Sequence, residues 1–66
     1  MTSIQTAIER MEAEYREMPG LMLTARQAER LLGLDRNTCE LAISALMQRR
    51  FLTQTAEGTY LRQRAG

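Results

Sequence analysis

The apolar residues near the N-terminus recur at the spacing of a helix. They follow one another at steps of 4, 3, 4 and 3 residues, which places them on one stripe of a helix surface. The members of the stripe are Ile4, Ile8, Met11, Tyr15 and Met18. Thr2 and Gln5 have the spacing of a capping box, so the helix is expected to begin at about Ser3 or Ile4. Pro19-Gly20 is expected to end it.

A short apolar run, Leu21-Met22-Leu23, follows and predicts an edge strand, since it is too short for a helix. Thr24 then has the position of a helix cap, with Gln27 completing a capping box. Gly33 is the expected left-handed stop of this second helix. Its predicted buried side consists of Ala28, Leu31 and Leu32.

Asp35 is placed to cap a third helix that runs to about Arg49 or Arg50. The apolar face of this helix is expected to hold Cys39, Ala42, Ile43, Leu46 and Met47. Residues 51–55 and 59–62 are rich in aromatic and β-branched side chains and flank Ala56-Glu57-Gly58. That pattern predicts a β-hairpin, followed by a tail over residues 63–66.

The predicted order is helix, short strand, helix, helix and hairpin, in a single domain over residues 1–66. The expected fold class is therefore α+β, mainly α, with three helices, a short strand and a C-terminal hairpin (α-β-α-α-β-β). The N-terminal helix takes residues 1–18, and the remaining elements lie within residues 21–62.

The second and third predicted helices carry a known pattern: an apolar helix end, a glycine, an apolar residue, a polar cap and a small polar helix start. The matching stretch is Ala28-Glu29-Arg30-Leu31-Leu32-Gly33-Leu34-Asp35-Arg36-Asn37-Thr38. Ile43, Leu46, Phe51 and Leu52 match the apolar positions that lead into the hairpin. Residues 21–62 thus resemble a bacterial winged helix-turn-helix domain of the transcription-regulator type. The resemblance implies sequence-specific binding of double-stranded DNA by a recognition helix from about Arg36 to Arg49.

The implied contacts divide by side-chain type. Arg36 and Asn37 are suited to guanine and adenine edges, and Thr38 and Ser44 to phosphates or bases. Arg26, Arg30 and Arg62 are expected to hold phosphates, and Arg64 lies nearby in sequence. The candidate DNA-binding set is Arg26, Arg30, Arg36, Asn37, Thr38, Leu41, Ser44 and Arg62.

The charge pattern gives the DNA interpretation a competitor. Net charge is only +1, with −2 over residues 1–18 and +3 over residues 19–66, and all nine basic residues are arginine. The exposed face of the third helix carries Glu40 and Leu41, and the hairpin tip carries Glu57. Glu29 and Arg50 stand where the family often has a small residue and a glycine. The alternative is therefore a winged-helix protein–protein interaction module that does not bind DNA.

The N-terminal stripe also has two interpretations. It packs on the domain's own core, or Ile4, Ile8, Met11 and Tyr15 form a coiled-coil-like seam in a homodimer. No catalytic set can be assembled, because the chain lacks histidine, and its one cysteine, Cys39, is expected in the core. We therefore expect no enzymatic activity, no metal and no cofactor. The absence of a signal peptide or a long apolar run leads us to expect a cytoplasmic protein without a membrane partner.

Overall fold

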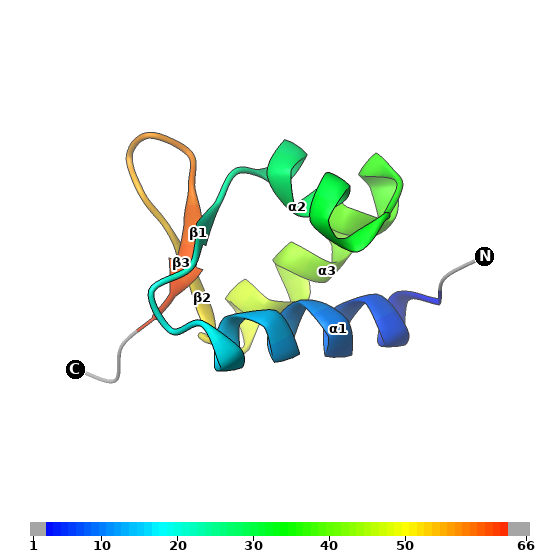
Figure 1. Ribbon diagram of the computed structural model, residues 1–66, viewed down its shortest axis with the longest axis horizontal. Coiled ribbons are helices and arrows are strands. Elements are labelled where there is room, and N and C mark those ends of the chain that lie inside the picture. Colours follow the sequence, from blue (N-terminus) through cyan, green and yellow to red (C-terminus); the bar gives the residue numbers. More distant parts are fainter. Residues whose placement is uncertain (1–2, 64–66) are drawn as a thin grey trace.

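The structure, a computed structural model that describes residues 3–63, has three helices and a small antiparallel sheet (Figure 1). The helices are α1 (Ile4–Glu17), α2 (Ala25–Leu32) and α3 (Arg36–Gln48), and the strands are β1 (Met22–Leu23), β2 (Leu52–Gln54) and β3 (Tyr60–Arg62). The order α-β-α-α-β-β confirms the predicted mainly helical α+β class. Of the expected tail, residues 64–66 lie outside the described residues.

The first helix begins where the sequence predicts, but with a different cap. Ser3 is the N-cap of α1, and its side-chain oxygen accepts a hydrogen bond from the backbone N–H of Thr6 at 3.1 Å. The predicted Thr2–Gln5 box is therefore wrong by one residue, and Thr2 itself lies outside the described residues. Helix α1 ends at Glu17, and its C-cap Met18 directly precedes the predicted stop at Pro19-Gly20.

The caps of the other two helices are confirmed. Thr24 and Gln27 form a complete capping box, with hydrogen bonds of 3.1 and 2.8 Å in the two directions. Gly33 ends α2 in the left-handed conformation, at φ 65°. Asp35 caps α3 by accepting a hydrogen bond from the N–H of Thr38 at 2.6 Å. The three-residue connection between α2 and α3 is thus determined by local interactions.

The sheet has the order β1-β3-β2, so β1 is an edge strand as predicted. Both pairings are antiparallel, with Leu23 opposite Tyr60 and Thr53 opposite Leu61. Gly58 closes the hairpin turn at φ 88°, and its N–H donates to the carbonyl of Thr55. The hairpin extends away from the helices on the left of Figure 1.

Helices α1, α2 and α3 and strand β2 enclose one apolar core. Ile8, Met11 and Tyr15 of the N-terminal stripe are each at most 6% exposed, whereas Ile4 is 42% exposed. Their burial inside one chain favours packing on the domain's own core over a seam between two copies. The hydroxyl of Tyr15 donates to the backbone carbonyl of Tyr60 at 2.8 Å, which joins α1 to β3.

The prediction that Leu31 is buried is wrong, because its side chain is 46% exposed. Helix α2 has only eight residues and buries a narrow face, formed by Ala28 and Leu32 one turn apart. Leu31 precedes Leu32 and is rotated by about 100° away from that face. The next buried position is Leu34, just beyond the helix. No helix within residues 3–63 has the length and apolar character needed to cross a membrane.

Candidate nucleic-acid interface

Helix α3 presents one complete face to solvent. Its opposite face is buried against the core through Cys39, Ala42, Ile43 and Leu46. The outward residues are all exposed, as the helical spacing predicts: Arg36, Asn37, Glu40, Leu41, Ser44 and Gln48. The exposed face therefore combines side chains that donate and accept hydrogen bonds with one large apolar side chain, Leu41, which is 43% exposed.

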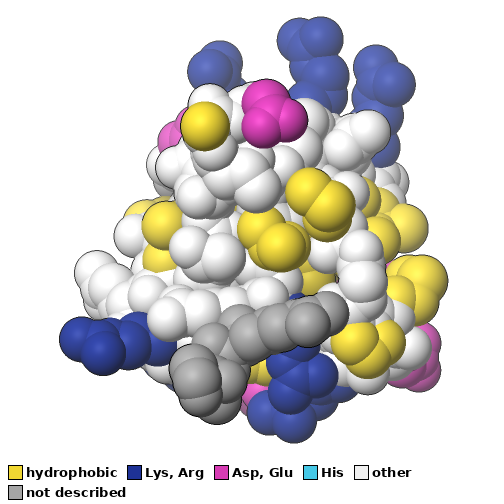
Figure 2. All heavy atoms as spheres, turned by 90° about the vertical axis from the view of Figure 1, so that its left-hand side faces the viewer, with side chains coloured by type: hydrophobic (Ala, Val, Ile, Leu, Met, Phe, Trp, Pro, Cys, Tyr) yellow, Lys and Arg dark blue, Asp and Glu magenta, His cyan; other side chains and the backbone are white. Residues whose placement is uncertain are grey.

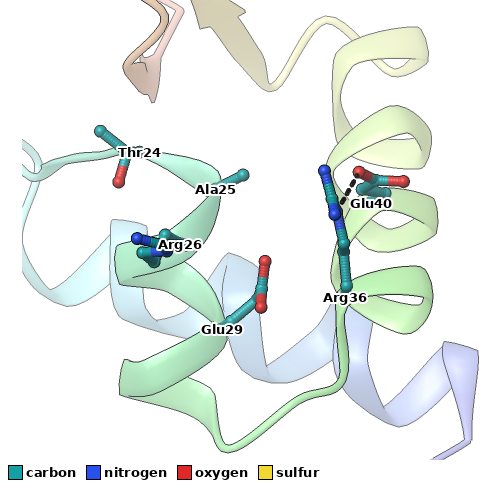
Figure 3. A pocket seen from close by; sticks show the side chains of 6 residues that line it. All are labelled: Thr24, Ala25, Arg26, Glu29, Arg36 and Glu40. Atoms are coloured by element: carbon teal, nitrogen blue, oxygen red, sulfur yellow. Dashed lines mark ion pairs between the residues drawn. The ribbon is translucent and has the colours of Figure 1, made fainter.

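An open cleft separates the N-terminal halves of α2 and α3 (Figure 3). Its volume is about 440 Å³, and its lining residues are Thr24, Ala25, Arg26, Glu29, Arg36 and Glu40. Figure 3 shows Glu29 pointing toward the gap from α2, while Arg36 extends along α3 toward Glu40. Arg36 Nε lies 3.5 Å from Glu40 Oε1, and both side chains are mostly exposed. Such an exposed pair contributes little to stability, so Arg36 can exchange Glu40 for another anion at low cost.

A second hollow of about 290 Å³ adjoins the first and lies between α3 and β3. It is lined by Ala25, Glu40, Ile43, Ser44, Met47 and Tyr60. Because Glu40 and Ala25 border both hollows, a ligand on the exposed face of α3 would meet a charged cleft on one side and a more apolar one on the other.

The predicted phosphate-binding arginines are placed unevenly. Arg26 and Arg30 are exposed on α2, one turn apart. Thr38 is only partly buried, and its N–H is used by Asp35 at the cap. Arg62 has its guanidinium carbon 5.2 Å from the centre of the Phe51 ring, a cation–π distance. Arg62 therefore shares the Phe51 ring with Arg16 of α1, whereas Arg26 and Arg30 lie on α2.

Arg62 belongs to a group of arginines at the C-terminal end of α3. Arg16 also lies over the Phe51 ring, at 5.5 Å, and pairs with Glu12, while Arg49 Nη1 is 3.9 Å from the same carboxylate. We call Arg16, Arg49, Arg50 and Arg62 the C-terminal arginine group. Its members come from α1, from the segment after α3 and from β3. Arg49 and Arg50 are neighbours in the sequence. That Arg16 and Arg62 lie close to them follows only from the tertiary structure.

On the face drawn in Figure 2, the arginines do not form one continuous basic band. The described residues hold eight arginines and eight acidic side chains. Figure 2 shows arginine side chains at the top of the view and along its lower edge, with hydrophobic and uncharged side chains between them. On this face, the basic side chains therefore lie toward two opposite edges.

Cys39 has the properties of a packing residue. Its side chain is fully buried, and its Sγ donates to the carbonyl of Ala25 at 3.6 Å. Burial raises the pKa of the thiol to about 11, with a further contribution from the negative charges of Glu29 and Glu40. The nucleophilic thiolate is thus strongly disfavoured at neutral pH. Within residues 3–63, no three histidine, cysteine or acidic residues are grouped as metal ligands would be.

Comparisons of the chain with protein-family models, with curated proteins and with solved structures found no match.

Proposed function

We propose that the chain is a winged helix-turn-helix domain that binds double-stranded DNA, with α3 inserted into the major groove. The observation that carries the proposal is the face of α3 whose side chains are exposed from Arg36 at one end of the helix to Gln48 at the other. The major groove is about 12 Å wide and admits one α-helix. Helix α2 and the β2–β3 hairpin would then flank the groove.

The exposed side chains suit different parts of the duplex. Arg36 and Asn37 lie in the first turn of α3. The N-terminal residues of a recognition helix commonly contact base edges in the major groove. Leu41 would contact a thymine methyl group, and Ser44 a base or a phosphate. Arg26 and Arg30 would hold phosphates from α2.

The proposal includes a homodimer on two half-sites, because two copies would multiply the weak contacts of one small domain. The pairing surface has to differ from the predicted seam. Ile8, Met11 and Tyr15 are already enclosed by the core of their own chain. Ile4 is the only member of the predicted seam that remains exposed.

A salt titration tests the proposal. We expect the protein to bind a mixed-sequence duplex, measured by fluorescence anisotropy, with an affinity that falls steeply as salt rises. Each phosphate contact contributes about 0.9 to the slope of log affinity against log salt. Replacing both Arg26 and Arg30 by alanine should therefore lower the slope by about 1.8.

The matched control is Arg10→Ala, which removes an exposed arginine from α1. Its affinity and slope should equal those of the unaltered protein. The proposal fails if the folded protein binds no duplex at low salt. It also fails if Arg10→Ala weakens binding as much as the loss of Arg26 or Arg30.

A protein–protein interaction module is the second candidate, and the exposure of Leu41 favours it. Leu41 lies on the same face as Glu40, which borders the apolar hollow lined by Met47 and Tyr60. An exposed apolar side chain beside such a hollow suits a protein partner. The same titration separates the candidates, because an interaction module of this kind has no salt-dependent affinity for DNA.

A further inference from the structure

Arg50 has an unusual backbone conformation. It is the one non-glycine residue of the described chain with a positive φ, at 60°. In this left-handed region Cβ comes close to the backbone, so most residues are disfavoured there. Glycine adopts it freely, and asparagine and aspartate adopt it more readily than other residues. Arginine is therefore an unfavourable residue at this position.

The same chain contains the matching turn with glycine. After α2, Gly33 is left-handed at φ 65°, and the N–H of Leu34 donates to the carbonyl of Glu29 at 3.0 Å. After α3, Arg50 takes the place of Gly33, and the N–H of Phe51 donates to the carbonyl of Leu46 at 2.9 Å. The C-terminal ends of α2 and α3 both have the six-to-one hydrogen bond of a Schellman motif. This motif needs one residue in the left-handed conformation, and its hydrogen bonds join backbone groups only. The backbone thus gives no reason for arginine at position 50.

The side chain of Arg50 does not compensate for this strain within the described part of the chain. Arg16, Arg49 and Arg62 each contact Glu12 or the Phe51 ring. Arg50 is exposed, and among residues 3–63 it takes part in none of the ion pairs or arginine–aromatic contacts. Backbone strain at a residue whose side chain makes no such contact points to a binding role for that side chain.

The position of Arg50 indicates the ligand. It lies in the C-terminal arginine group, where Glu12 is the carboxylate paired with Arg16 and Arg49. Helix α3 has 13 residues, so it is about 20 Å long at 1.5 Å per residue, and Arg50 lies two residues beyond its C-terminal end. Between Arg36 and Arg50, the exposed face carries Asn37, Leu41 and Ser44, together with Glu40, whose carboxylate pairs with Arg36. A helix with an arginine at each end suits a groove that has a phosphate backbone on each side.

We propose that Arg50 binds a backbone phosphate of the duplex, on the strand across the major groove from the phosphates held by Arg26 and Arg30. This inference rests on the proposed DNA binding. It assigns to the C-terminal end of α3 a contact that orients the helix across the groove. It also explains the arginine at a position that favours glycine.

The test is Arg50→Gly, with stability and DNA binding measured on the same samples. Glycine relieves the strain, so the melting temperature should rise by about 3–6 °C. Affinity for mixed-sequence duplex should nevertheless fall several-fold, and the salt slope should decrease by about 0.9. A purely structural residue would not move stability and binding in opposite directions.

Arg50→Lys is the matched control, because it keeps both the charge and the strained backbone. It should retain the melting temperature and the salt slope of the unaltered protein. If Arg50→Gly is more stable but binds DNA with unchanged affinity and slope, the phosphate contact is refuted and the proposed function stands. If Arg50→Gly is less stable, the strain argument is refuted. If the unaltered protein binds no duplex, the proposed function fails and this contact fails with it.

Discussion

Tyr15 provides a sharp test of the tertiary structure. Its hydroxyl donates to the carbonyl of Tyr60 at 2.8 Å, and its side chain is 1% exposed. Tyr15→Phe removes this hydrogen bond and keeps the ring that fills the core. One such bond contributes about 1 kcal/mol, against a total stability of about 3–10 kcal/mol for a chain of this length. The melting temperature should therefore fall by about 4–8 °C.

The same residue makes stability depend on alkaline pH. Burial raises the pKa of Tyr15 from 10.0 to about 12, because the core disfavours the phenolate. The folded state thus keeps its phenol proton where the unfolded chain loses it. This contribution is fully present below pH 10 and is lost as the pH rises toward 12. The pKa difference of two units between the folded and unfolded states corresponds to a contribution of at most about 2.7 kcal/mol to the free energy of unfolding.

The assay is urea unfolding followed by circular dichroism at pH 9 and at pH 11.5. The pKa of Cys39 is also raised, from 9.0 to about 11, so this thiol too lowers stability as the pH rises. The unaltered protein and Tyr15→Phe are therefore also compared in a background that carries Cys39→Ala. Tyr60→Phe is the control. Among residues 3–63, the Tyr60 hydroxyl accepts one exposed hydrogen bond, from Gln54 at 3.3 Å, so its loss should cost less than about 0.5 kcal/mol. If Tyr15→Phe has the urea midpoint and the pH dependence of the unaltered protein, the placement of α1 against β3 is wrong.

Two further predictions concern a helix end and the core. Thr24→Ala removes the capping box of α2 and should lower the free energy of unfolding by about 1 kcal/mol in urea titrations, whereas an effect below about 0.3 kcal/mol would contradict the capping geometry. At neutral pH, Cys39 should react with a thiol-alkylating reagent far more slowly in the native protein than in urea. The reason is that the thiol is buried and its pKa is raised to about 11. Equal rates in the two states would show that the native protein has an accessible thiolate.

The sequence by itself determined the order of the elements and most of their ends. Helix caps depend on residues three positions apart, as in Thr24 with Gln27, and turns depend on single residues such as Gly33. The exposed face of α3 follows from its own 3.6-residue period. These features were predictable because each depends on interactions within about one helical turn.

Burial and side-chain partners were decided only by the tertiary structure. A stripe spaced 4-3-4-3 packs equally well on its own core or on a second copy, and it was the placement of α1 that enclosed Met11 and Tyr15. The exposure of Leu31 and the attraction of Arg62 to Phe51 likewise depend on elements far away in the chain. The Tyr15–Tyr60 bond joins residues 45 positions apart. Such contacts depend on how separate elements pack, and a local pattern carries no information about the partner that lies across the core.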